Sequence, residues 1–196
     1  MKKLLFGLTL LATFTLTTSC NGGSIDVCNT KDMKTLGEKV LNKLDENAVV
    51  SNIEFEKNSN QELRLTTKFA KLIVQYRNDA KESKVLVYDV IKGKFDIADS
   101  KYPIVGTGGR ILSVQDFEKM SDNINKAIEE QKKSNIQTIG VGLYKIRPAK
   151  SPQYETYTFR LYEEVETEKK DMWIRYNEYS CSMDGDGNIK SLHLGW

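Results

Sequence analysis

The sequence predicts an α+β fold of two units, each a helix followed by an antiparallel meander of strands. Apolar residues recur at helical period in two segments, 31–45 and 114–133, and segments with the alternation typical of strands follow each of them. The apolar residues of the second segment repeat those of the first at a constant offset of 84 positions, so that Met120 corresponds to Leu36. The same pattern is compatible with one continuous sheet, and the sequence leaves both arrangements open.

The first unit is expected to span residues 30–93 and to begin with a helix that Thr30 caps. Strands are predicted at 49–56 and 84–91. Residues 63–77 fit either a helix or strands. The threonines and adjacent β-branched residues of this segment favour strands.

A connector is expected over 94–112, because this segment contains a proline and a run of glycines. The second unit, 113–196, opens on Ser113 and Asp116, whose spacing is that of a helix capping box. Four strands are predicted after its helix, at 137–146, 155–164, 171–182 and 188–194.

The last two strands are separated by a strong hairpin signal, since Asp-Gly and Gly-Asn pairs supply the positive φ angles of a tight turn. Asp184, Asp186 and Asn188 also place oxygen ligands at alternate positions, as calcium loops do. Ile189 stands where the EF-hand pattern requires glycine, so a simple turn is favoured over a metal site. No cofactor is expected.

Tandem units of one helix and a meander resemble the secreted β-lactamase inhibitory proteins, and a single unit resembles a cystatin-like domain. The resemblance lies in the order of elements over residues 30–196. It implies a fold and carries no activity with it.

The first 20 residues have the layout of a secretory signal, with two lysines, an uncharged run over 4–16 and then small residues. The run of about thirteen residues is shorter than the roughly twenty that a membrane-spanning helix needs. Because Cys20 directly follows the small residues, the segment resembles a bacterial lipobox. This resemblance implies cleavage before Cys20 and its acylation, with Thr17 departing from the usual leucine. A plain secreted protein is the alternative.

In lipoproteins of this kind, an aspartate directly after the lipidated cysteine would imply an anchor in the inner membrane. Here Asn21 follows Cys20, so the resemblance implies a lipid anchor in the outer membrane. Several acyl chains hold a protein firmly on a bilayer. The expected organisation is a signal peptide at 1–19, lipidated cysteine and tether at 20–29, first unit at 30–93, connector at 94–112 and second unit at 113–196.

Charge excludes one class of partner. The chain has 29 Lys and Arg against 27 Asp and Glu, and two of the lysines belong to the leader, so the mature chain carries no net charge. It therefore lacks the basic footprint that binding to a phosphate backbone requires, and no nucleic acid partner is expected.

With Cys20 acylated, Cys28 and Cys181 remain, in a compartment where disulfides persist. A bridge between them would join the start of the folded region to its last hairpin. Two buried thiols are the alternative.

No catalytic constellation is found in the sequence. Serine and cysteine nucleophiles need a nearby base, and the single histidine, His193, lies in the last predicted strand beside two leucines. Carboxylates are plentiful but fall mostly on helix faces and loop tips, which leaves an acid-dependent hydrolase as a minor hypothesis.

Half of the chain's aromatic residues lie in 144–196, and those outside the core are expected to form a binding surface. The candidates are Tyr144, Tyr162, Tyr176 and Trp173. The leading hypothesis is a lipid-anchored, non-enzymatic envelope protein that binds another protein as an inhibitor, immunity factor or assembly subunit. The alternative is a module that stacks these rings on a glycan or another small ligand.

Overall fold

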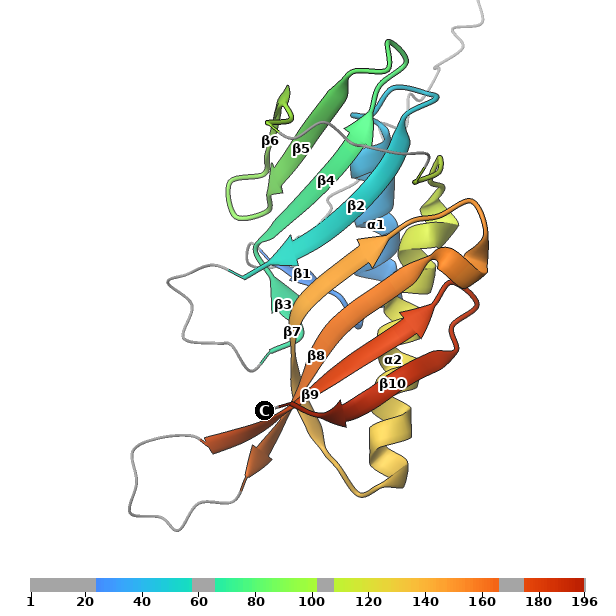
Figure 1. Ribbon diagram of the computed structural model, residues 1–196. Coiled ribbons are helices and arrows are strands. Elements are labelled where there is room, and N and C mark those ends of the chain that lie inside the picture. Colours follow the sequence, from blue (N-terminus) through green and yellow to red (C-terminus); the bar gives the residue numbers. More distant parts are fainter. Residues whose placement is uncertain (1–23, 58–65, 102–107, 166–174, 196) are drawn as a thin grey trace, which may run out of the picture.

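The computed structural model describes residues 24–57, 66–101, 108–165 and 175–195 (Figure 1). The predicted leader, with Cys20, lies outside the described residues. In the described part of the chain, no helix is long and apolar enough to cross a membrane. The elements in chain order are β1 (Ile25–Asp26), α1 (Thr30–Leu41), β2 (Val49–Glu56), β3 (Lys68–Phe69), β4 (Lys71–Arg77), β5 (Ser83–Asp89), β6 (Lys94–Asp99), α2 (Val114–Lys133), β7 (Thr138–Arg147), the 3-10 turn η1 (Pro152–Tyr154), β8 (Thr156–Val165), β9 (Arg175–Asp184) and β10 (Ile189–Leu194).

Eight strands form one antiparallel sheet in the order β10-β9-β8-β7-β2-β4-β5-β6. The first long strand after each helix, β2 or β7, lies at the centre of the sheet, where Ile53 pairs with Ile146. Both helices lie on the same face of the sheet (Figure 1). The α+β class is therefore confirmed, and of the two arrangements left open the structure has the continuous sheet.

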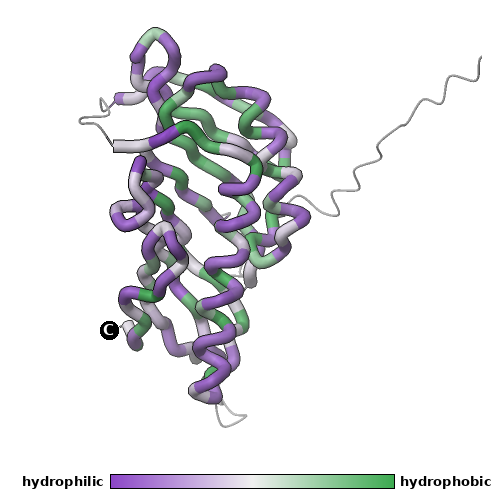
Figure 2. Tube along the Cα trace, turned by 90° about the vertical axis from the view of Figure 1, so that its right-hand side faces the viewer, coloured by the Kyte–Doolittle hydropathy of each residue, from purple (hydrophilic) through white to green (hydrophobic). Residues whose placement is uncertain are grey.

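A single hydrophobic core lies between the helices and the sheet, and both halves of the chain contribute to it. Hydrophobic stretches of the chain lie in the interior, between the helices and the strands (Figure 2). The helices approach each other closely at Gly37, where an added Cβ would stand 2.8 Å from Cδ2 of Phe117. The aligned stripes of the two helices, Leu36 and Val40 on α1 with Met120 and Ile124 on α2, are buried as expected.

The helix boundaries follow their caps. For α2 the predicted range 114–133 is confirmed, and the Asp116 carboxylate accepts hydrogen bonds from the backbone N–H and hydroxyl of Ser113. The expected Thr30 cap of α1 is wrong, because Asn29 Oδ1 accepts from the first backbone amides. Helix α1 also ends at Leu41 rather than at 45, since the amides of Lys43 and Leu44 bond three residues back instead of four.

Two predictions for the first half of the chain have different outcomes. The strand interpretation of 63–77 is confirmed for its described part, which forms β3 and β4. The connector expected over 94–112 is wrong at its start, because Lys94–Asp99 forms the edge strand β6. This strand pairs along one side only and is largely exposed, and its two alternating apolar residues, Phe95 and Ile97, are a weak strand signal beside the glycines of the expected connector.

Tyr144, expected on the exposed set of aromatics, is instead fully buried, and this expectation is wrong. The pairing of β7 with β8 shifts between Gly142 and Lys145, so a bulge reverses the alternation and turns Leu143 outward. The Tyr144 ring stacks on Phe55 with centroids 5.1 Å apart, and its hydroxyl donates to the Met120 carbonyl at 2.8 Å.

Cys28 and Cys181 are both free thiols, so the predicted bridge is not formed in this structure. Cys28 is held at α2 because its carbonyl accepts a hydrogen bond from Asn125 Nδ2 at 3.0 Å. Cys181 lies in the sheet opposite Phe159. Burial raises the pKa of each thiol to about 12, with Asp26 adding to the effect at Cys28, so both remain protonated at neutral pH.

Candidate functional site

The face of the sheet opposite the helices is open to solvent (Figure 1). Along β8, Phe159 and Leu161 point into the core and are fully buried, whereas Arg160 between them is exposed. Side chains one residue out of phase with the core therefore form the open face. Polar and aromatic groups on this face make it the candidate binding surface.

A groove of about 480 Å³ lies on this side of the sheet, where β2 passes β7, β8 and β9. It is called the tyrosine groove below. Its polar and aromatic lining includes Glu54, Lys57, Arg160, Tyr162, Tyr176 and Glu178.

Two of the aromatic residues singled out in the sequence meet in the tyrosine groove. The rings of Tyr162 on β8 and Tyr176 on β9 pack edge to face, with centroids 5.1 Å apart and an interplanar angle of 77°. Tyr176 is 40% exposed and Tyr162 is half-buried. Burial, and then the nearby Glu178 carboxylate, raise the pKa of Tyr162, so its hydroxyl stays protonated and can donate a hydrogen bond.

A glycine makes room for this pair. The Tyr162 side chain lies across β7 at Gly142, where an added Cβ would stand 2.2 Å from its hydroxyl oxygen. Sequence reasoning assigned no role to Gly142. A glycine inside a predicted strand does signal a close approach, but the approaching side chain cannot be read from the sequence.

Most of the charged groups around the rings are paired with one another. Arg160 Nη1 lies 3.3 Å from Glu178 Oε1, and Lys145 Nζ lies 2.9 Å from Glu54 Oε2. Both pairs are partly exposed, and such pairs contribute only about 0.2–1 kcal/mol each to stability. Their effect on this face is to leave it close to neutral around the aromatic pair.

Lys57 closes the end of the tyrosine groove that lies next to β3. Its ammonium group donates to the Thr66 carbonyl and stands 5.0 Å from the centroid of the Phe69 ring. Burial lowers the pKa of Lys57 to about 8. At neutral pH the group is still mostly a cation, placed where carbonyl and ring can both stabilise it.

The remaining predicted binding residues do not join this site. Tyr144 belongs to the core, as described above. Trp173 lies outside the described residues.

The candidate calcium ligands form a turn that is already satisfied. The Asp184 carboxylate accepts from the backbone N–H groups of Asp186 and Asn188 and lies 2.7 Å from Lys190 Nζ. The Lys190 and Asn188 hydrogen bonds hold the pKa of Asp184 well below its usual range. Lys126 Nζ donates to the Gly187 carbonyl at 2.6 Å. Of the three candidate ligands, Asp184 is thus already paired with an ammonium group, and no metal-binding cluster of His, Cys, Asp and Glu occurs among the described residues.

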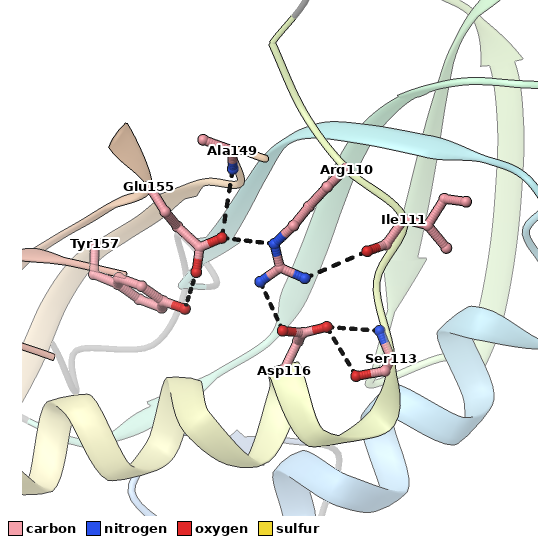
Figure 3. A network of polar contacts seen from close by, with 7 residues as sticks. All are labelled: Arg110, Ile111, Ser113, Asp116, Ala149, Glu155 and Tyr157. Atoms are coloured by element: carbon pink, nitrogen blue, oxygen red, sulfur yellow. Dashed lines mark hydrogen bonds and ion pairs between the residues drawn. The ribbon is translucent and has the colours of Figure 1, made fainter. Parts of the chain in front are cut away.

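A second polar cluster lies on the helix side of the sheet (Figure 3). Arg110 binds two carboxylates at once, with Nη2 2.6 Å from Asp116 Oδ1 and Nε 2.8 Å from Glu155 Oε2. Glu155 is 2% exposed and also accepts from the Tyr157 hydroxyl at 2.6 Å. Burial opposes ionisation of Asp116, but the Arg110 and Ser113 hydrogen bonds outweigh it and lower its pKa. One guanidinium thus contacts both carboxylates.

The Arg110 cluster has a structural consequence. The backbone of Arg110 forms an isolated antiparallel bridge with Val50, beside β2, while its side chain reaches the first turn of α2 and the start of β8. It thereby joins the two halves of the chain at one end of the sheet.

Comparison of the chain with protein-family models, with curated proteins and with solved structures gives no match.

Proposed function

We propose that this protein is a lipid-anchored envelope protein whose tyrosine groove binds a protein partner without catalysing a reaction. The observation that supports this most is the edge-to-face pair of Tyr162 and Tyr176 on the face of the sheet opposite α1 and α2. Tyrosine rings offer rigid contact area with a polar tip, and buried tyrosines dominate the energetics of many protein interfaces.

The charges around the rings define the chemistry of the partner. Arg160 is paired with Glu178, and Lys145 with Glu54, so neither sign is in excess beside the aromatic pair. A partner surface of matching chemistry has an apolar or aromatic anchor for the rings and a neutral, hydrogen-bonding rim. An inhibitor, immunity factor or assembly subunit on a lipid tether would present this face to such a partner close to the bilayer.

A glycan is the second candidate ligand. The exposed face of Tyr176, beside the Arg160–Glu178 pair, offers the combination of ring stacking and polar hydrogen bonding that sugars use. Binding on a glycan array that is lost in Tyr176→Ala would favour this candidate over a protein partner.

Site-specific crosslinking in intact cells tests the protein-binding proposal. A photo-crosslinking amino acid at position 176 should form one discrete protein adduct, and Tyr162→Ala should abolish it. Position 154 is the matched control, because Tyr154 is 71% exposed on the separate turn η1. An absence of adducts at 176, or the same adducts at 154 and 176, would contradict the proposal.

The anchor requires its own test. Cells that express the full chain should incorporate labelled palmitate into it, and Cys20→Ala should abolish both the label and sedimentation with membranes. An unlabelled chain recovered with its leader uncut would overturn the envelope assignment.

A further inference from the structure

A second cavity, of about 380 Å³, opens at the other end of β2 from the tyrosine groove. It is called the junction pocket below, because the segment that links the two halves of the chain forms one of its walls. Its lining consists of Val49, Arg77, Gly109, Arg110, Ile111 and Lys150.

Three elements bring these residues together. Arg77 ends β4 and pairs across the sheet with Val49 at the start of β2. The link runs past them at Gly109, where φ is +100° and an added Cβ would stand 2.4 Å from the Val50 carbonyl oxygen. Only glycine allows this approach, so the wall of the pocket is built into the backbone.

Positive charge accumulates in the junction pocket without an equal number of anions. Arg110 is matched by Asp116 and Glu155. The structure gives neither Arg77 nor Lys150 an ion-pair partner within the described ranges 24–57, 66–101, 108–165 and 175–195. Two cations at one cavity therefore remain uncompensated.

An orphaned donor adds an independent observation. Arg77 Nε is buried from solvent and has no hydrogen-bond partner in the part of the chain that the structure describes. A buried N–H group without an acceptor is unfavourable and rare in folded proteins, and a ligand is one of the groups that can satisfy it. A guanidinium has a planar fork of donors that fits two oxygens of a carboxylate or a phosphate.

We infer that the junction pocket binds an oxyanion, a carboxylate or a phosphate, carried on a small molecule. Arg77 donates to it through its fork, Lys150 adds a second positive charge at the rim, and Val49 and Ile111 contact its apolar part. This site is separate from the tyrosine groove, and the inference does not depend on the proposed protein partner.

Titration of the full chain with inorganic phosphate, acetate and butyrate tests the inference. The Arg77 Nε–H signal in a nitrogen-15 spectrum reports on binding, and sodium chloride keeps the ionic strength constant so that general screening does not contribute. Phosphate or acetate should shift this signal saturably. Saturation by phosphate alone identifies a phosphate ligand, and saturation by acetate with tighter binding of butyrate identifies a carboxylate on an apolar chain.

Variants assign the binding to the pocket. Calorimetric titration should show affinity reduced about tenfold or more by Arg77→Gln and by Lys150→Gln, a loss typical of one charged hydrogen-bonding group. Lys71→Gln, which removes an exposed lysine on β4 outside the pocket, should leave the affinity unchanged. If Arg77→Gln fails to fold, Arg77→Lys keeps the charge without the fork and should still weaken binding. A linear, unsaturable response to both anions, or equal affinity in Lys150→Gln and Lys71→Gln, would overturn the inference.

Discussion

The two faces of strand β8 differ in the contacts that their side chains make. On the covered face, Tyr157, Phe159 and Leu161 are fully buried under the helices. On the open face, Arg160 and Tyr162 are partly exposed and contact residues of the neighbouring strands. The difference indicates that one face supplies most of the free energy of folding, while the other can change with little effect on the fold and is available for binding.

The largest effect is expected on the covered face. Phe159→Ala should lower the free energy of unfolding by about 3–5 kcal/mol, because it opens a cavity beside Tyr144 in the core. Denaturant titration measures this loss. Thr158→Ala, an exposed position on the same strand, should change the free energy by no more than about 0.5 kcal/mol. Similar losses for the two variants would show that the faces are not distinct.

The next effect concerns the Arg110 cluster, which joins the halves on the covered face. Arg110→Met should cost about 3 kcal/mol, because it leaves the buried Glu155 carboxylate without its cation. Arg147→Met is the matched control at an exposed arginine. A stability equal to that of the control would mean that the cluster does not join the two halves.

A smaller effect is expected where the open face is most crowded. Gly142→Ala should cost about 1 kcal/mol, since the added methyl group displaces the flexible end of Tyr162. Combining it with Tyr162→Ala should remove most of that cost, because the clash is then absent. A double-mutant cycle measures the coupling. Strictly additive losses would contradict the contact between these two residues.

The smallest effect is a change in the pH dependence of stability. The folded-state pKa of Asp116 is lowered, so its ionised form stabilises the fold above the ordinary aspartate pKa of about 3.9. That contribution is lost as pH falls from there through the folded value. Asp116→Asn should therefore flatten the decline of unfolding free energy below about pH 4. Parallel pH curves for variant and wild type would contradict this role.

Local signals in the sequence were sufficient for the elements whose partners follow closely in the chain. The capping box at Ser113 and Asp116 located α2, and the Asp-Gly and Gly-Asn pairs located the last hairpin. Apolar and β-branched residues located the strands β2 and β8. In each case the contacts that decide the structure join residues close together in the sequence, or the residues recur at a fixed period.

Apart from the cap and the end of α1, the errors lie where long-range contacts decide the outcome. A bulge in β7 buried Tyr144, because two glycines allowed the strand to shift its register. Strand β6 offered only Phe95 and Ile97 as an alternating signal, and of these only Phe95 packs against the core while Ile97 is exposed. The Arg110 cluster joins residues 45 positions apart, and no local pattern marks such a contact. The tyrosine groove was found in part, because Tyr162 and Tyr176 face outward as their alternation predicts.

Footprinting of tyrosines tests most directly whether the open face is occupied in the cell. Iodination of the purified chain and of the chain in intact cells should differ at Tyr162 and Tyr176, which a bound partner would protect in cells. Tyr154, exposed away from the groove, should react equally in both samples. Equal labelling of Tyr162 and Tyr176 in the two samples would contradict the account of the open face as a binding surface.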